Sequence, residues 1–355
     1  MRLTRRSALG VLGSAVLGGS LGHAAASEAA PASIPDDQPV PVIYDSDMDF
    51  DDASTLAYLC EEHKLGRIDL RAVTVANNGF GHPERTLRHA RSVLEQCGLP
   101  QVPVAEGATG AGVHPAPPEL VATIENVLTG ALGDASLLRY RAPMSAPDLI
   151  CRTVLDSARP VTVVATGPLT NLAAALCVPR VAARIGRIQI MGGALEVPGN
   201  LYGSALPGFD NSQEFNMWLD PVSARTVLRK ALSSSVYLVP LDATASVPIT
   251  RTFIARLAAN QDAPGARLAY RIASQPDLLA LIDLGIMYWW DAAAAVALVH
   301  EELAPFRDAR VDVVQDGVQS GRTMVSPAGS RVHAAFDVNT EAFEQRFLDS
   351  LNGRP

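Results

Sequence analysis

Short apolar runs alternate along the chain with longer segments in which apolar residues recur every three or four positions. The runs are rich in Val, Ile and Ala and predict buried β-strands, whereas the wider spacing predicts amphipathic helices. The predicted strands cover residues 40–45, 70–76, 102–105, 160–165, 187–191, 235–240, about 310–314 and about 332–338. The predicted helices cover residues 52–62, 83–96, 147–157, 169–176, 221–232, several segments of 250–280, 291–299 and 340–351. We interpret residues 106–147 as loop with irregular helix and residues 192–213 as a Gly-rich loop.

This alternation is typical of an α/β fold. The strands are apolar along almost their whole length, so helices should cover both faces of a mostly parallel sheet in a single domain. In such sheets ligands bind beyond the carboxyl ends of the strands. Polar clusters do follow several predicted strands, at residues 45–52, 77–78, 166–167, 191–193 and 241–242. The sequence therefore predicts a ligand site at that edge of the sheet.

The first 26 residues are typical of an export signal. A basic start containing the motif TRRS precedes a Gly/Ala/Leu-rich stretch and the small residues Ala24 and Ala26. This pattern predicts a twin-arginine signal that is cleaved off, which would place the protein in the periplasm or outside the cell. We expect residues 1–26 to be removed, residues 27–39 to be flexible and residues 40–355 to form the catalytic domain. The apolar stretch is short and contains glycines, so we expect no stable membrane anchor.

Composition narrows the range of partners. The formal net charge is −8 and Lys and Arg form no cluster, which argues against binding to a nucleic-acid backbone. The four cysteines show no C-x-x-C spacing and lie in or near predicted helices. We interpret them as buried thiols, although an oxidising compartment would permit a disulfide. They are Cys60, Cys97, Cys151 and Cys177.

Five aspartates stand within the eight positions from Asp45 to Asp52, directly after the first predicted strand. Such a cluster is either an acidic, solvated turn or a cation site. Uncompensated carboxylates would repel one another at this density, and the N-terminus of the following helix would offset only part of that repulsion. Calcium takes about six to eight oxygen ligands in adaptable geometry, which suits crowded carboxylates.

Two other classes of acidic site were considered. An EF-hand loop needs glycine at its sixth position and glutamate at its twelfth, where this chain has Phe50 and Leu56, so that class is excluded. A strand followed by D-x-D is also typical of aspartate-nucleophile phosphatases, in which Asp45 would attack phosphorus. Those enzymes usually have Thr or Val at the place of Asp49, and they give Asp51 and Asp52 no role. The phosphatase stays a weaker alternative.

The spacing D-x-D-x-x-x-D-D of Asp45, Asp47, Asp51 and Asp52 resembles the fingerprint of the inosine-uridine preferring nucleoside hydrolases, a family of calcium-dependent N-ribohydrolases. Later segments resemble the family's other motifs in the same order: VATGPLTNLAAAL, IQIMGGALEVPGN, EFNMWLDPVSARTVL, VPLDAT, YWWDAAAAVAL and AAFDVNTEAFEQRFL. The resemblance covers nearly the whole chain after the signal. It implies a Rossmann-like nucleoside hydrolase fold, a nucleoside substrate and a homo-oligomer, either dimer or tetramer.

The resemblance also implies roles for individual residues. Asp47, Asp52, Asp291 and the carbonyl oxygen of Thr166 would bind Ca²⁺, and Asp47 would act as the base for a calcium-bound water that attacks the N-glycosidic bond. The ribose would be held by a set of polar residues and one methionine. They are Asp51, Asn78 and Asn216 at the ribose hydroxyls and Met191, Asn200 and Glu214 at the 5′-hydroxyl.

Two departures from the family pattern matter. A glycine usually stands where this chain has Asp49 or Phe50, so a backbone with positive φ there would be strained; Asp49 could also reach the sugar. Many members have a histidine near the leaving base, where this chain has Trp290.

Trp290 resembles the purine-specific branch, in which an aromatic side chain stacks on the base. Phe80 or Tyr288 would complete the sandwich, and we predict a preference for purine nucleosides. Two alternatives stay open: Trp290 is merely a core residue, or the protein is an exported nucleoside-binding protein without activity.

Overall fold

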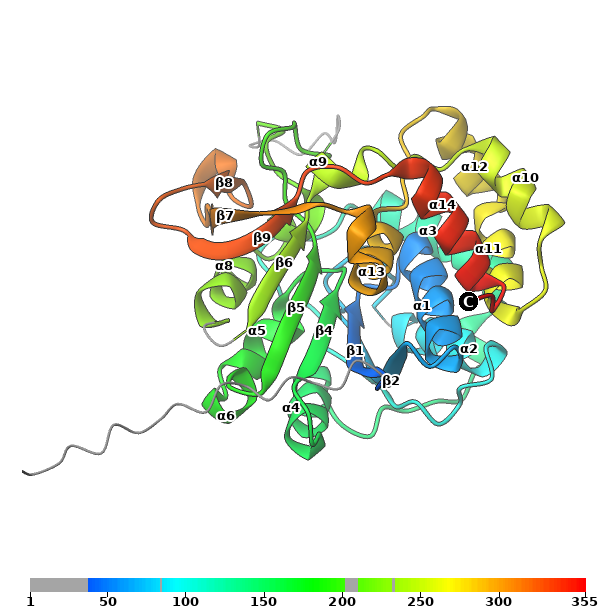
Figure 1. Cartoon of the computed structure of the whole chain (residues 1–355), viewed down its shortest axis with the longest axis horizontal. Helices are drawn as coiled ribbons and strands as arrows, with labels where there is room; N and C mark the ends of the chain where they lie inside the picture. Colours follow the sequence, from blue (N-terminus) through cyan, green and yellow to red (C-terminus); the bar gives the residue numbers. More distant parts are fainter. Residues whose placement is uncertain (1–37, 84, 202–209, 232–233) are drawn as a thin grey trace, which may run out of the picture. The chain divides into compact units, whose positions relative to one another are not determined.

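A nine-stranded sheet forms the centre of the fold (Figure 1). The computed structural model describes residues 38–83, 85–201, 210–231 and 234–355. The strand order is β3-β2-β1-β4-β5-β6-β9-β7-β8; neighbours from β3 to β9 are parallel, and β7 is antiparallel to both β9 and β8. The bounds are β1 Val40–Ser46, β2 Ile68–Val75, β3 Val104–Glu106, β4 Val161–Ala165, β5 Ile185–Met191, β6 Ser235–Val239, β7 Phe306–Val313, β8 Thr323–Val325 and β9 Ser330–Ala335. The predicted α/β class with a mostly parallel sheet is confirmed.

The order β3-β2-β1-β4-β5-β6 places a topological switch between β1 and β4. From β1 the chain adds β2 and β3 on one side, and it later returns to add β4, β5 and β6 on the other side. Because the crossover helices leave in opposite directions at this point, a crevice opens beyond the carboxyl ends of β1 and β4. The aspartate cluster follows β1, so this switch is where a ligand site is expected.

Both faces of the sheet are covered, as the apolar strands predicted. In β1, Val42 and Tyr44 belong to the core on one face and Ile43 to the core on the other, and all three are fully buried. Helices on the Val42 face are α1 Phe50–Lys64, α2 Thr86–Gln96, α3 Pro118–Leu132, α9 Leu241–Thr244, α10 Arg251–Ala259, α11 Pro264–Ala273, α12 Pro276–Asp283, α13 Trp290–Val299 and α14 Thr340–Leu351. Helices on the Ile43 face are α4 Ala146–Asp156, α5 Thr170–Leu176, α6 Pro179–Ala182 and α8 Pro221–Lys230.

The remaining short elements are α7 Phe215–Leu219 and the 3₁₀ turns η1 Ala135–Leu137, η2 Glu301–Leu303 and η3 Gly317–Gln319. Two expectations need correction. Helix α3 is a regular 15-residue helix within the stretch interpreted as loop and irregular helix. Its Pro118 is at the start, where proline is tolerated, and its apolar residues are buried against the core, so the local Gly and Pro content was misleading. Strand β8 was not predicted, because three residues carry too little pattern.

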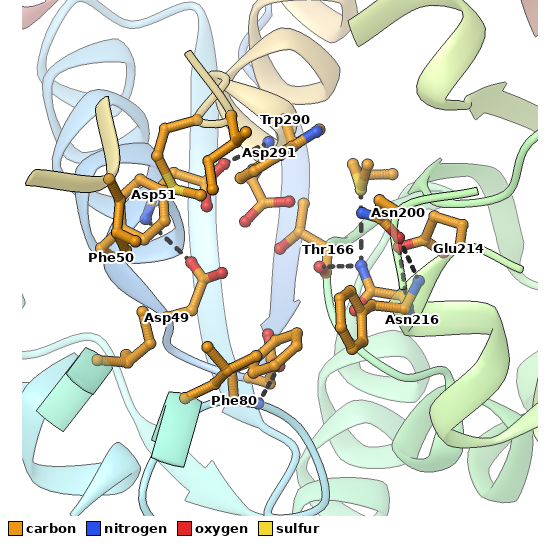
Figure 2. A pocket seen from close by; sticks show the side chains of 18 of the residues that line it. Asp49, Phe50, Asp51, Phe80, Thr166, Asn200, Glu214, Asn216, Trp290 and Asp291 are labelled. Atoms are coloured by element: carbon orange, nitrogen blue, oxygen red, sulfur yellow. Dashed lines mark hydrogen bonds between the residues drawn. The ribbon is translucent and has the colours of Figure 1, made fainter. Parts of the chain in front are cut away.

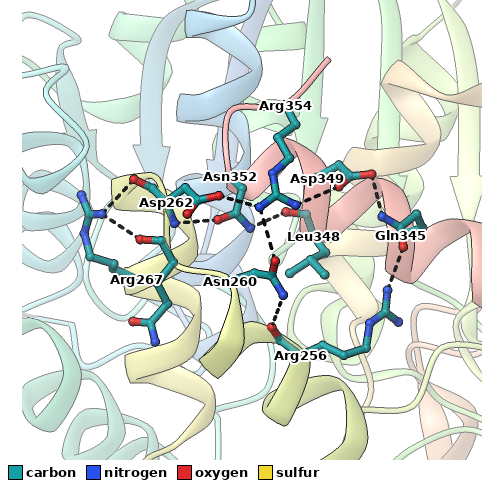
Figure 3. Close-up of polar contacts among 10 residues, drawn as sticks. Arg256, Asn260, Asp262, Arg267, Gln345, Leu348, Asp349, Asn352 and Arg354 are labelled. Carbon is teal, nitrogen blue, oxygen red and sulfur yellow. Dashed lines mark hydrogen bonds and ion pairs between the residues drawn. The ribbon is translucent and has the colours of Figure 1, made fainter.

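A cluster of polar contacts links helix α14 and the residues after it to the connection between α10 and α11 (Figure 3). Asn352 accepts a hydrogen bond from the backbone N–H of Asp262 at 2.8 Å and donates one to the carbonyl of Leu348 at 2.8 Å. Arg354 donates to Asn260 at 3.3 Å and pairs with Asp349 at 3.5 Å. These contacts tie the end of the chain to the helical segment that continues into α12.

The predicted export signal at 1–26, and all but the last two residues of the predicted flexible segment 27–39, lie outside the described residues. Within the described residues, each helix is too short or too polar to cross a membrane. The four cysteines are free thiols; Cys60 and Cys97 are buried, whereas Cys151 is half-buried and Cys177 exposed. The expectation of buried thiols therefore holds for two of the four.

Candidate active site

A cavity of about 220 Å³ lies beyond the carboxyl ends of β1 and β4. One part of its lining is polar and the other apolar or aromatic. The polar residues are Asp47, Asp49, Asp51, Thr123, Thr166, Asn200, Glu214, Asn216 and Asp291. The others are Phe50, Phe80, Leu120, Ile124, Met191, Phe215, Leu281, Ile286, Met287 and Trp290. Figure 2 shows the side chains of 18 of these residues around the cavity and labels ten of them.

The turn from β1 into the start of α1 carries Asp47, Asp49 and Asp51, whose carboxylates line the cavity beyond the carboxyl end of β1. Asp49 is the N-cap of α1: its Oδ1 accepts hydrogen bonds from the backbone N–H groups of Asp51 at 2.9 Å and Asp52 at 3.1 Å. The Asp52 side chain accepts from the N–H of Asp49 in return, which completes a capping box. The concern about a missing glycine is also resolved. Asp49 has φ −78°, and the left-handed conformation is adopted instead by the buried Met48, with φ 54°.

Asp47 is packed against glycines of the segments that follow β2 and β4. Its Oδ2 accepts a hydrogen bond from the N–H of Phe80 at 2.6 Å. A Cβ at Gly79 would overlap that carboxylate oxygen, and Cβ atoms at Gly81 and Gly167 would meet the Asp47 backbone. Only residues without a side chain can approach Asp47 so closely, so its carboxylate is held in one position.

Asp52 is the most densely hydrogen-bonded of the five early aspartates. Its Oδ1 accepts from the hydroxyls of Tyr44 and Thr166, both at 2.6 Å, and its Oδ2 accepts from the N–H of Asp47 at 3.2 Å. Tyr44 is in β1 and Thr166 follows β4. The carboxylate therefore joins the two strands at the switch.

Asp291 arrives from α13, far along the sequence, and meets the early cluster. Its backbone N–H donates to Asp51 Oδ2 at 2.9 Å. One carboxylate oxygen from each of Asp49, Asp52 and Asp291 lies within 4.8 Å of the others, so the three can hold a metal ion. Figure 2 shows Asp49 and Asp291 pointing into the cavity from different elements. The predicted ligands Asp52 and Asp291 therefore come together, but the third carboxylate of this group is that of Asp49 and not that of the predicted Asp47.

The donor set fits a hard divalent cation. The three groups are carboxylates, which suit Ca²⁺ or Mg²⁺ better than softer metals. Buried Asp51 also has one oxygen, Oδ1, with no hydrogen-bond partner in the described part of the chain. A buried, unpaired carboxylate oxygen is costly unless a cation or polar ligand satisfies it.

Burial and mutual repulsion raise the pKa values of the carboxyl groups in the site and so favour their neutral form. Burial, followed by the negative charge of Asp52, raises the pKa of Asp47 well above its usual value. Burial raises the pKa of Asp51 and of Asp291 in the same way, with the charges of Asp49 and Asp51 respectively as the next cause. The pKa of Asp49 rises to about 6 because of burial and the charge of Asp52. A bound cation would reverse these shifts, because it favours the charged carboxylates.

The opposite polar wall is built around α7. Glu214 caps this helix, accepting from the N–H groups of Asn216 at 2.8 Å and Met217 at 3.0 Å, and it also accepts from Gly193 at 3.0 Å. Burial raises the pKa of Glu214. Asn216 donates to the Thr166 carbonyl oxygen at 2.8 Å and contacts the Met191 sulfur at 3.5 Å. This carbonyl oxygen is the one that the family resemblance assigned to the metal.

Asn200 and Asn78, which were predicted to hold the ribose, make hydrogen bonds within the protein. Asn200 lines the cavity, and its Oδ1 accepts from the N–H of Phe215 at 3.0 Å. Asn78, predicted to grip the ribose, is not a lining residue; its Nδ2 donates to Thr170 Oγ1 at 3.0 Å. In the described structure the Asn78 side chain therefore contacts the first residue of α5.

Asp45, the nucleophile of the phosphatase alternative, is buried behind the cavity. Its Oδ1 accepts from the hydroxyl of Thr74 at 2.7 Å and from the amide of Asn171 at 2.9 Å. Burial raises its pKa to about 7. Asp45 is not among the lining residues, so this geometry gives the phosphatase no support.

The aromatic residues divide between cavity and core. Trp290 lines the cavity and packs edge-on against Phe50, with ring centroids 6.3 Å apart. Phe80 also lines the cavity and packs against Phe215 at 4.6 Å. In the view of Figure 2, Trp290 and Phe80 lie at opposite edges of the lining. Trp289, by contrast, is a core residue, 1% exposed, so the core interpretation applies to it and not to Trp290.

Comparison with known proteins decides the family. The family model described as inosine-uridine preferring nucleoside hydrolase matches residues 42–345, which is most of the chain. The chain belongs to this family.

Individual relatives agree with that placement. The pyrimidine-specific ribonucleoside hydrolase RihA of Salmonella enteritidis is 35% identical over 225 residues, which cover 62% of this chain and 66% of that protein. The matched part of RihA is thus just under two thirds of its length.

Solved structures share the fold. The inosine-uridine preferring nucleoside hydrolase of Bacillus anthracis superposes with a TM-score of 0.76 at 23% identity, covering 88% of this chain and 99% of that one. The purine-preferring ribonucleoside hydrolase of Gardnerella vaginalis gives a TM-score of 0.67 at 23% identity, covering 88% of this chain and 98% of that one. The chain is thereby a member of a family of N-glycosyl hydrolases with the α/β architecture of Figure 1.

Part of the cavity lining of this nucleoside hydrolase was not predicted from the sequence. It consists of Leu120, Thr123 and Ile124 from α3 and of Leu281, Ile286 and Met287 at and after α12. Apart from Thr123 these residues are apolar, as are dozens of core residues, so no sequence signal separates them. Phe50 and Phe215 stand next to predicted site residues, and that adjacency was the one usable clue.

Proposed function

We propose that this protein hydrolyses the N-glycosidic bond of ribonucleosides, preferably purine nucleosides, to free base and ribose with the help of Ca²⁺. The observation that carries the proposal is the convergence of Asp49, Asp52 and Asp291 within 4.8 Å beside a cavity that Trp290 also lines. Carboxylates suited to a cation, a candidate base in Asp47 and the indole of Trp290 thus support the proposal.

The reaction breaks the bond between the ribose C1′ and a base nitrogen while water adds its oxygen to C1′. Bound calcium would neutralise the carboxylates, lower the pKa of water and hold vicinal hydroxyls, with Asp47, Asp52, Asp291 and the Thr166 carbonyl as the ligands that the family resemblance implies. Asp47 takes the proton of the attacking water. Its fixed position among Gly79, Gly81 and Gly167 favours this role, because a base must lie within hydrogen-bond reach of the proton.

The ribose and base are held on different walls. Asp51 has an unpaired oxygen for a ribose hydroxyl, and Asn216, Asn200 and Glu214 line the wall expected to receive the rest of the sugar. Positive charge develops on the ribose ring as the bond breaks, and the surrounding carboxylates stabilise it. The base leaves as its anion and takes a proton from water. The apolar wall offers it stacking on Trp290.

The purine preference depends on Trp290. An indole offers a large flat surface, and stacking of a base on an aromatic ring is worth about 1–3 kcal/mol. The names of the relatives point both ways: RihA is called pyrimidine-specific, and the Gardnerella vaginalis enzyme purine-preferring. Direct comparison of substrates must therefore decide between a purine and a pyrimidine nucleoside.

The experiment is a ribose-release assay on purified protein with inosine and uridine, before and after treatment with a calcium chelator. We expect inosine to be cleaved with the higher kcat/KM, activity to vanish on chelation and to return with Ca²⁺. Asp47→Asn should lower kcat by about 10²–10⁴-fold, whereas Asp283→Asn on the exposed end of α12 should leave it unchanged. Faster turnover of uridine would overturn the purine preference.

Trp290 variants sharpen this test. Trp290→Ala should lower the inosine-to-uridine ratio of kcat/KM by about 10-fold or more, since stacking is lost. Trp290→Phe keeps an aromatic ring and should retain most of the ratio. Binding of inosine without ribose release by the intact protein would instead favour the non-catalytic alternative.

Export and self-association are also proposals. The TRRS motif at the start of the chain motivates export by the twin-arginine route. Replacement of Arg5 and Arg6 by lysine should abolish export of the protein, measured by cell fractionation. Light scattering of the mature protein should give the mass of a dimer or tetramer; a monomer would contradict that expectation.

A further inference from the structure

Asp49 is the side chain by which this chain departs from the family pattern at the cation site. The family resemblance led us to expect a glycine here or at Phe50, yet Asp49 has ordinary backbone angles and its carboxylate lines the cavity. The left-handed turn is supplied one residue earlier by Met48. The loop therefore accommodates an extra acidic group without strain at that position.

The carboxylate of Asp49 is fixed by the helix that it caps. Its Oδ1 accepts the N–H groups of Asp51 and Asp52, so the side chain cannot swing away without uncapping α1. An oxygen of Asp49 meanwhile lies within 4.8 Å of one from Asp52 and one from Asp291. The group is thus held in place for coordination before any cation arrives.

The same place is rich in uncompensated charge. Asp51 has a buried oxygen with no partner among the described residues, and it lines the same cavity. The carboxylates of Asp49, Asp52 and Asp291 come within 4.8 Å of one another, a distance at which like charges repel. An added aspartate would only worsen this repulsion unless it also gained a cation.

We propose that Asp49 is a further ligand of the active-site cation, contributed by the N-cap of α1. The assignment rests on the proposed function, which supplies the cation. A carboxylate that caps the helix and binds the ion couples the two events, so occupation of the site stabilises the first turn of α1. An added oxygen ligand also favours Ca²⁺ over Mg²⁺, because calcium takes about six to eight oxygens and magnesium keeps more of its water.

Serine and asparagine variants separate the two roles of Asp49. Asp49→Ser keeps one oxygen that caps the helix but lacks the second oxygen of the carboxylate. Asp49→Asn keeps the cap through its single amide oxygen and has an NH2 group, which cannot bind a cation, in place of the second oxygen. Ser, Asn and Asp are similar N-caps, so both variants should keep the melting temperature of the chelator-treated protein within a few degrees of the wild type.

The deciding measurement counts the water molecules on bound europium(III), an ion that accepts the same kind of oxygen ligands as Ca²⁺. Luminescence lifetimes in H₂O and D₂O give this number, which does not respond to a mere loss of charge. We expect Asp49→Ser and Asp49→Asn each to gain about one water, because both keep the cap but lose the second carboxylate oxygen and water replaces the lost ligand. Calorimetry with Ca²⁺ should show a dissociation constant raised about 10-fold or more in Asp49→Ser.

The outcomes distinguish this assignment from the proposed function. If the wild type binds europium and Ca²⁺ but Asp49→Ser has the same number of coordinated waters, Asp49 is only a helix cap and the assignment fails alone. If the wild type binds neither ion, the proposed function loses its cofactor and the assignment falls with it.

Discussion

The two walls of the cavity are built in different ways. The polar wall consists of side chains at the ends of β1 and β4, at the start of α1 and around α7, and hydrogen bonds to the backbone fix several of them, as for Asp49 with the N–H groups of Asp51 and Asp52. The apolar wall consists of side chains from α3, α12 and the segment before α13, of which Ile124 and Met287 pack on the core. The polar wall is formed mainly at the ends of sheet strands, whereas the apolar wall is formed by helices that pack on the sheet.

This difference separates chemistry from selectivity. Hydrogen bonds to fixed backbone groups position the acids to within a small fraction of an ångström, as catalysis requires. Packing contacts tolerate exchange of one apolar side chain for another of similar volume. We therefore expect changes on the polar wall to cost activity on every nucleoside, and changes on the apolar wall to alter the choice of base.

The largest effect should come from Gly79→Ala on the polar wall. The added methyl group overlaps Asp47 Oδ2 and must push the carboxylate away. A displacement of about 1 Å can cost about 100-fold in rate, so kcat should fall at least that much for inosine and uridine alike. Steady-state kinetics on both nucleosides measure the effect.

Gly66→Ala is the matched control for that variant. Gly66 has φ 74° and open space around its Cα, so alanine there strains the backbone without touching the site. It should lower stability by about 1 kcal/mol and leave kcat unchanged. An equal loss of kcat in both variants would mean that general destabilisation, and not the position of Asp47, explains the result.

A smaller effect is expected from Met287→Ala on the apolar wall. The Met287 carbonyl accepts from the Ile249 N–H at 2.9 Å, so its backbone should stay in place while the cavity widens. Loss of apolar contact is worth about 1–3 kcal/mol, so KM for the preferred base should rise about 10-fold with little change in kcat. Met324→Ala, on exposed β8, is the control. Equal rises in KM for both nucleosides would contradict a role in choosing the base.

Acid should loosen the apolar wall before it affects the sheet. Burial by itself would raise the pKa of Glu125 on α3, but hydrogen bonds from His89, Arg85 and Thr129 lower it from 4.5 to about 2. The group therefore stabilises the fold above about pH 4.5 and loses that contribution as the pH falls toward 2.

Urea unfolding at several pH values tests this dependence. In Glu125→Gln, the free energy of unfolding should fall less steeply below pH 4.5 than in the wild type. Glu119→Gln, an exposed change on the same helix, should follow the wild type. Identical slopes in all three proteins would show that Glu125 does not support α3.

The smallest effect is expected from Thr123→Val. Thr123 lines the apolar wall, but its hydroxyl donates to the Glu119 carbonyl at 2.9 Å within its own helix. Valine has nearly the same shape, so kcat/KM for inosine should change by less than about 3-fold. A larger loss would mean that the hydroxyl turns toward the nucleobase, and the wall would then be less apolar than its contacts indicate.

Individual residues show which features of the fold and the site could be predicted from the sequence. Strand–helix alternation predicted the sheet, and the family resemblance implied that Asp52 and Asp291, separated by more than 200 positions, would meet. The sequence also suggested Asn78 as a ribose ligand, whereas the structure has it bonded to Thr170. An amide side chain can turn toward either neighbour, and motif spacing does not record which way it turns.

By itself the sequence determined the class of fold, the edge of the sheet that carries the site and the acidic groups available to it. These follow from local patterns: apolar runs make strands, and residues directly after a strand must lie at its carboxyl end. The tertiary structure alone decided that Met48 takes the left-handed turn, that Asp49 joins Asp52 and Asp291, and that α3 closes the cavity. Such facts depend on which distant surfaces pack together, and a buried leucine at a cavity has the same local pattern as one in the core.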